Sequence, residues 1–139
     1  MNRSEFCELL NQAKKQSGTT TSDLMFDMRM QWCVLKRFET GVHNFNLKKV
    51  LTYLDVINAK LCLYNQETQI VVSSYLQIIQ WFIQNRTGRY TQRELARIIG
   101  CTGVNLSSIE AQKSTMSIDT FLKLADVFGY TVTIKQNDK

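Results

Sequence analysis

Few residues of this chain have the side chains that catalysis or metal binding requires. The 139 residues include one histidine, His43, and four cysteines, Cys7, Cys33, Cys62 and Cys101, which lie far apart and form no CxxC pair. Zinc sites and thiol active sites need such residues at short spacings, and the chain also has no phosphate-binding loop or nucleophile motif. We therefore expect no enzymatic activity, no metal and no cofactor. In a reducing compartment, the thiols are expected to be small packing residues rather than disulfides.

Binding of an anion is the chemistry for which the sequence is better equipped. Lys and Arg number 17 against 12 Asp and Glu, so the net charge is +5 and the pI is near 9.1. This balance favours a nucleic-acid partner, although ordinary solvated surfaces can have the same charge. The basic residues in or beside the motifs described below are Lys36, Arg37, Lys48, Lys49, Arg86, Arg89, Arg93 and Arg97. Each is a candidate phosphate contact or an ordinary solvated side chain.

Part of this charge lies in the stretch TQRELARIIGCTGVNLSSIE, which runs from Thr91 to Glu110 and contains two short helical patterns. Thr91 suits an N-cap with Glu94 as its capping-box partner, Gly100 suits a helix end, and Thr102 suits the next N-cap. Two short helices joined by a turn with glycine form a helix-turn-helix, whose second helix enters the DNA major groove. On spacing alone, a plain helical hairpin within a core is the alternative.

The same pattern occurs earlier in the chain. A shift of 71 positions aligns the two copies without a gap and matches Leu24 with Leu95 and Glu39 with Glu110. Apolar residues recur at the same helical spacing in both copies, which predicts the same buried faces. The sequence therefore predicts one unit present twice.

Each copy is expected to begin with one more helix, over residues 4–16 and 70–85, and to end in a strand. The first of these helices directs Phe6, Leu9, Leu10 and Ala13 toward the core. The strands follow Asn58 and Gly129, which suit the left-handed end of a helix. We expect the two strands to pair antiparallel as in a pseudo-dimer. The residues buried between the copies would be Leu61, Leu63, Val132 and Ile134.

The fold expected from these elements is mostly α, with two tandem helix-turn-helix bundles that each end in a short strand. The first domain covers residues 1–65 and the second residues 66–139. The segment that joins them, residues 65–69, is too short to be a free tether.

Residues 90–132 resemble the phage-repressor and Cro-like (lambda-repressor-like, XRE-type) helix-turn-helix family. The family pattern is met at Thr91, Gln92, Glu94, Leu95, Ala96, Leu106, Ile109, Glu110, Ile118, Phe121, Leu124, Ala125, Phe128 and Gly129. The first copy keeps Glu39 and Gly41 but has Met25 in place of the small alanine and Arg29 in place of the turn glycine. The resemblance implies a lambda-repressor-like fold for both copies, with the first more divergent.

The resemblance also implies which residues face DNA. The base-contacting candidates are Lys36, Arg37, Gly103, Val104, Asn105 and Ser108, and the phosphate-contacting candidates are Arg89, Gln92, Arg93, Thr102, Ser107 and Lys113. Asn105 and Ser108 can bond a base edge, Val104 can meet a thymine methyl, and Arg37 is the candidate for a guanine. Trp32, Cys33 and Val34 also take groove-facing positions. For Trp32, a core or interface anchor is favoured over a base contact.

Two functions are compatible with these features. The first is a sequence-specific double-stranded DNA-binding transcriptional regulator, a repressor in the simplest case, which reads an imperfect palindrome with two non-identical recognition helices. Such a chain would be a monomeric pseudo-dimer or a homodimer. The alternative is a protein-interaction module of the same fold, such as an antitoxin-like protein that binds a partner protein. No stretch approaches the roughly 20 apolar residues of a membrane span, so a cytoplasmic protein is expected.

Overall fold

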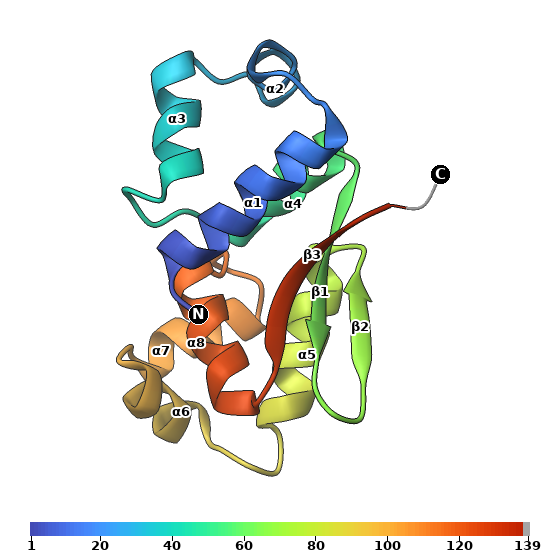
Figure 1. Cartoon of the computed structure of the whole chain (residues 1–139). Coiled ribbons are helices and arrows are strands. Elements are labelled where there is room, and N and C mark those ends of the chain that lie inside the picture. The colour runs from blue at the N-terminus through green and yellow to red at the C-terminus, as the bar shows by residue number, and fades with distance from the viewer. Residues whose placement is uncertain (138–139) are drawn as a thin grey trace.

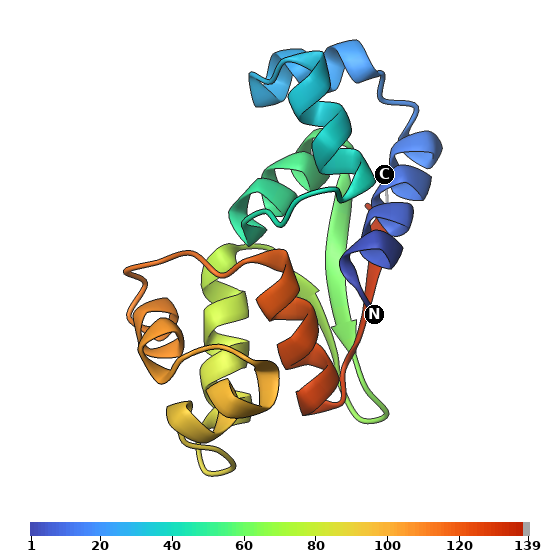
Figure 2. The ribbon, with the colours of Figure 1, turned by 90° about the vertical axis from the view of Figure 1, so that its left-hand side faces the viewer.

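The computed structural model describes residues 1–137, which form eight helices and a three-stranded sheet (Figure 1). The elements in chain order are α1 (Arg3–Ser17), α2 (Thr21–Met28), α3 (Trp32–Thr40), α4 (Leu47–Val56), β1 (Ala59–Tyr64), β2 (Gln69–Val72), α5 (Tyr75–Arg86), α6 (Gln92–Ile99), α7 (Gly103–Glu110), α8 (Ile118–Phe128) and β3 (Thr131–Gln136). Figures 1 and 2 show the helices on one side of the sheet. None of the helices within residues 1–137 is long and apolar enough to cross a membrane.

The two predicted pairs of short helices, α2–α3 and α6–α7, begin and end where the sequence expects. Thr20 and Thr91 both cap a helix by accepting a bond from the backbone N–H three residues later. For α6, only this half of the predicted capping box is among the hydrogen bonds of residues 1–137. In the first pair, α2 ends at Arg29, whose φ is 54°. This is the left-handed conformation that Gly100 adopts at the end of α6, where φ is 79°. The α2–α3 pair, which lacks a glycine at this turn, therefore has a side chain in a region that favours glycine.

The predicted antiparallel pairing of the strands that follow α4 and α8 is confirmed. The sheet has the order β2-β1-β3, and the register of β1 with β3 places Leu61 opposite Ile134 and Leu63 opposite Val132. Leu61, Leu63 and Val132 are buried, and Ile134 is partly buried against the same core. The two halves therefore share one sheet and one hydrophobic core.

The prediction of a helix over residues 70–85 is wrong in its first residues. Residues 69–72 form β2, which pairs with β1, and α5 begins only at Tyr75 after the N-cap Ser74. The reason is local, because Ile70, Val71 and Val72 are three consecutive β-branched residues, which favour a strand. The joining segment is accordingly a hairpin turn, in which the Asn65 side chain accepts bonds from the backbone of residues 67 and 68.

The loops before α4 and α8 provide a second contact between the halves. Asn46 and Ser117 lie opposite each other in an isolated antiparallel bridge. Its hydrogen bonds run from Leu47 N–H to the Met116 carbonyl at 2.9 Å and from Ile118 N–H to the Phe45 carbonyl at 2.8 Å. The starts of α4 and α8 are therefore held side by side.

Candidate nucleic-acid interface

The two pairs of short helices lie on the same side of the molecule, away from the sheet. In Figure 1 the sheet is on the right, with α3 at upper left and α6 and α7 at lower left, and Figure 2 shows this side from the front. The second helix of each pair, α3 or α7, is the one that a helix-turn-helix places in the major groove. One face of the molecule therefore carries both candidate recognition helices.

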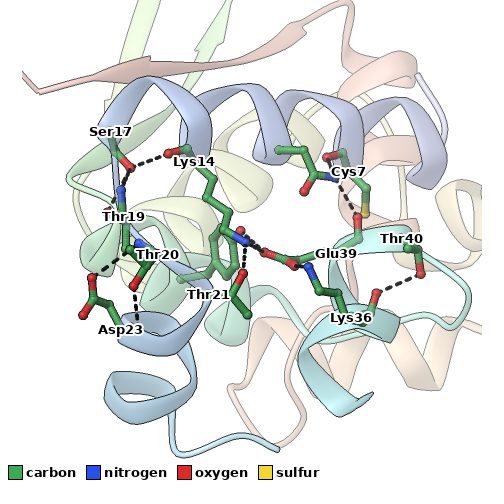
Figure 3. A network of polar contacts seen from close by, with 12 residues as sticks. Cys7, Lys14, Ser17, Thr19, Thr20, Thr21, Asp23, Lys36, Glu39 and Thr40 are labelled. Atoms are coloured by element: carbon green, nitrogen blue, oxygen red, sulfur yellow. Dashed lines mark hydrogen bonds and ion pairs between the residues drawn. The ribbon is translucent and has the colours of Figure 1, made fainter. Parts of the chain in front are cut away.

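A buried carboxylate fixes the position of α3. The side chain of Glu39 is only 3% exposed and lies 3.0 Å from the Lys14 ammonium of α1 (Figure 3). The Tyr53 hydroxyl of α4 donates to the same carboxylate at 2.6 Å, and Lys14 also donates to Thr21 of α2 at 2.9 Å. Burial, followed by this bond to Glu39, raises the pKa of Tyr53 far above its ordinary value. One carboxylate thus joins α3 to α1 and α4, and Lys14 extends the network to α2.

A matching carboxylate, Glu110, fixes the position of α7. It pairs with the Arg86 guanidinium of α5 through Nε and, at 3.1 Å, through Nη2. The Gln92 side-chain amide donates to the same carboxylate at 2.8 Å. Gln92 was predicted to contact a phosphate, but its side-chain amide is bonded inside the protein to Glu110. Sequence analysis assigned no role to the two carboxylates, although the identity of Glu39 with Glu110 under the 71-residue shift was the signal.

The predicted base-contacting residues are at the surface, with one qualification. Val104 is 77% exposed, Asn105 and Arg37 are exposed, and Gly103 and Ser108 are partly exposed. Lys36 differs, because its ammonium lies 3.5 Å from Glu39 and over the Trp32 ring at 5.9 Å. Among residues 1–137, Arg37 is therefore the exposed cation of α3 that forms no ion pair.

Of the two roles favoured on sequence grounds for Trp32, a core anchor or an interface anchor, the core anchor is wrong. Its side chain is 58% exposed at the first turn of α3. Gly103, its counterpart under the 71-residue shift, occupies the same place in α7, where an added Cβ would meet Arg93 Cα at 3.6 Å. The two pairs therefore differ at this position, because Gly103 lies close to α6 whereas Trp32 begins α3 as an exposed side chain.

The predicted phosphate-contacting residues do not form one group. Arg93, Ser107 and Lys113 are exposed, whereas the Thr102 hydroxyl caps α7 by accepting from Asn105 N–H at 3.1 Å. The Arg89 guanidinium lies over the rings of Tyr90 and Phe128, at 5.7 and 6.0 Å. Arg89 is thus held against the end of α8.

A shallow hollow beside α3 adds residues that sequence analysis did not place in the site. It has a volume of about 240 Å³, and its lining is Val34, Arg37, Phe38, His43, Asn44, Phe45 and Lys49. Arg37 and Lys49 thus contribute two cations to one surface next to α3. Such a surface suits a phosphate contact beside the groove. Lys49 is one of the basic residues for which the sequence left open a phosphate contact or an ordinary solvated side chain.

Comparison with known families supports the description of the fold. Residues 59–137, more than half of the chain, match the model of a helix-turn-helix domain family, and such a domain suggests DNA binding. The matched part begins with β1 and contains the whole sheet together with α5, α6, α7 and α8. No curated protein and no solved structure matches the chain.

Proposed function

Because the chain belongs to the helix-turn-helix domain family, we propose that it is a sequence-specific regulator of transcription that binds double-stranded DNA. In its simplest mode it is a repressor of the phage-repressor and Cro-like type that acts in the cytoplasm. The observation that carries the proposal is the presentation of α3 and α7 on one face of the molecule, away from the sheet (Figure 2). DNA binding of this kind needs no catalytic step, and the proposal includes none.

The register of the contacts between the halves supports an origin as two tandem copies, residues 1–65 and 66–139. In the sheet, Cys62 lies opposite Thr133, and in the loops Asn46 lies opposite Ser117. The members of each pair are 71 residues apart, which is the shift that aligns the copies. Contacts between equivalent residues are those that a two-fold axis produces. The chain thus resembles a dimer fused into one polypeptide, a monomeric pseudo-dimer.

Unusual backbone positions follow the same shift. Asn58 and Gly129 both adopt the left-handed conformation, with φ of 58° and 79°. Gln112, with φ 59°, likewise corresponds to Gly41, with φ 73°. Left-handed backbone is uncommon outside glycine, so its recurrence at equivalent positions supports two copies of one unit.

The two recognition helices differ in sequence, so the proposed operator is an imperfect palindrome. Arg37 of α3 corresponds to Ser108 of α7, and Trp32 corresponds to Gly103. An arginine suits a guanine, whereas Asn105 of α7 suits an adenine. Each half-site therefore has its own preferred sequence.

Selection of binding sites from random duplexes, followed by competition binding across a salt series, tests the proposal. We expect one preferred operator with two unlike half-sites and an affinity that falls steeply as salt rises, because phosphate contacts release counterions. Absence of any sequence preference together with a flat salt response would contradict it.

Thiol labelling provides a test of which surface faces DNA. Cys33 is exposed on α3, whereas Cys7 and Cys62 are buried and burial raises the pKa of Cys7 to about 11. A soluble thiol reagent at pH 8 should therefore modify Cys33 first, and the selected duplex should slow that reaction. A Cys33→Ser variant identifies the fast phase, and an unrelated duplex is the control. Equal rates with and without the selected duplex would place α3 away from DNA.

A second candidate function, binding of a partner protein, is favoured by exposed apolar residues on the first copy. Phe26 of α2 is 83% exposed and Val42 is 60% exposed, close in sequence to the exposed Trp32 and Val34. Apolar side chains in such positions suit a protein interface. A co-purified protein that stays bound at high salt, and that charge reversal at Arg37 and Arg93 leaves bound, would favour this function.

A further inference from the structure

The outer edge of β3 is unpaired within residues 1–137. Asn137 N–H donates to the Asn58 carbonyl at 3.0 Å, so these two opposite residues form a hydrogen-bonded pair. Hydrogen-bonded pairs alternate along an antiparallel ladder, so residues 131, 133, 135 and 137 direct their backbone N–H and C=O groups toward β1. The alternate residues, Val132, Ile134 and Gln136, therefore direct theirs away from the sheet. We call these three residues the open edge. Free N–H and C=O groups of a strand are a template for another strand.

The equivalent edge of β1 is occupied. Under the 71-residue shift, Val132 and Ile134 correspond to Leu61 and Leu63. Leu61 lies opposite Val72 of β2 and Leu63 opposite Ile70 of β2. Strand β2 thus occupies the outer edge of β1, whereas the equivalent edge of β3 has no strand within residues 1–137. The sequence of β2 shows what kind of segment fits such an edge.

Helix α1 covers the inner side of the open edge. The Gln136 side-chain amide donates to the Ala13 carbonyl at 2.8 Å, so this flank of α1 lies on β3. Leu9, one turn before Ala13 on the same flank, was predicted to be in the core but is only partly buried. An apolar side chain from an added strand would cover it.

The position of α1 decides what can occupy the open edge. Neighbouring strands are about 4.8 Å apart, whereas packed helices need about 8 to 10 Å between their axes. In Figure 2, α1 lies along β3. Pairing of β3 with β3 of a second copy would bring two α1 helices too close, so the edge has room for a strand but not for a second copy.

We infer that the open edge binds an extended segment of a partner protein, which adds to the sheet as a fourth strand antiparallel to β3. Such strand addition uses main-chain bonds for affinity and alternate side chains for specificity. As with Ile70 and Val72 of β2, alternate residues of the segment should be apolar and face the helices. Lys135 is exposed on the outer face and lies opposite Lys60, so an acidic residue of the segment at this place should strengthen binding.

Strand addition leaves the recognition helices accessible. The sheet and the two pairs of short helices lie on opposite sides of the molecule (Figure 1). A segment bound at the open edge and a duplex at α3 and α7 can therefore be present together. The inference does not depend on the proposed function, because peptide binding is measured without DNA.

The test uses a labelled peptide with the sequence of residues 66–74, QETQIVVSS, because these residues contain the strand that fills the equivalent edge of β1. We expect saturable binding to the full chain and slower amide exchange at Val132, Ile134 and Gln136. The peptide QETQSVSSS, which lacks the two inward apolar residues, should bind much more weakly. No binding of QETQIVVSS to the unmodified chain would overturn the inference.

Two proline variants locate the binding edge. Ile134→Pro removes an outward N–H without removing a bond to β1, and we expect it to weaken peptide binding about tenfold or more. Val71→Pro does the same at the free edge of β2 and is the matched control, with unchanged binding expected. Loss of binding in Val71→Pro, or no loss in Ile134→Pro, would overturn the inference. A dimer in sedimentation experiments that Ile134→Pro dissolves would also overturn it, because a second copy would then be the occupant.

Discussion

Replacing Glu39 by alanine is expected to lower the free energy of unfolding by about 3 to 5 kcal/mol. The substitution leaves the Lys14 ammonium, on a side chain that is 13% exposed, and the Tyr53 hydroxyl without their shared acceptor. A buried charge without a partner is much more costly than a buried pair. Urea unfolding followed by circular dichroism measures the loss, and no change in the urea midpoint would contradict the role of Glu39.

The Arg86–Glu110 pair provides the matched control for this prediction. In the Arg86–Glu110 pair both side chains are more exposed than that of Glu39, so water compensates part of the lost interaction. Glu110→Ala is therefore expected to cost less than Glu39→Ala, about 1 to 3 kcal/mol. Tyr53→Phe, which removes one hydrogen bond and keeps the ion pair, should cost about 1 kcal/mol. An order in which Glu110→Ala is the most destabilising variant would contradict this reasoning.

Replacing Arg37 by alanine is expected to weaken binding of the selected operator by about 1 to 3 kcal/mol, or about 5-fold to 150-fold. Arg37 is exposed on α3 and lines the hollow that also contains Lys49. Because a guanidinium recognises guanine through two parallel bonds, the loss should be confined to one base pair of one half-site. Competition binding with operators that vary at each position measures it.

Arg93→Ala is the comparison variant for Arg37→Ala. Arg93 is exposed at the start of α6, a position suited to a phosphate contact. Its loss should weaken binding to all duplexes about equally and reduce the salt slope by about one. If Arg37→Ala behaves in the same way as Arg93→Ala, then Arg37 contacts the backbone and does not read a base.

Most of the fold could be predicted because its signals are local. The N-caps Thr20, Thr91 and Thr102 act within three residues of themselves, and apolar spacing defines a buried face within a few turns. The segment around Ile70 was predicted wrongly because its apolar residues fit a helix, whereas their β-branching and the pairing with β1 favour a strand. Helix and strand patterns overlap in such a short apolar stretch.

The candidate site was predicted in its position but not in its supporting contacts. The exposure of Val104 follows from helical periodicity, which places it opposite the buried Leu106 and Ile109. The bond of Gln92 to Glu110 joins residues 18 positions apart on two helices, and no local pattern contains it. The bond between Lys14 and Glu39 likewise joins two helices, across 25 positions, and no local pattern contains it.

The sequence by itself determined the helix-turn-helix motif, the apolar pattern that recurs after 71 residues and the strands that pair, because each of these is encoded in spacing along the chain. Only the tertiary structure decided that α3 and α7 share one face, that Trp32 stays exposed, and that β3 has an open edge while β1 has β2. These features depend on how segments that are distant in the sequence pack against one another. That arrangement is set by the packing of the whole core, which the periodicity within one segment does not specify.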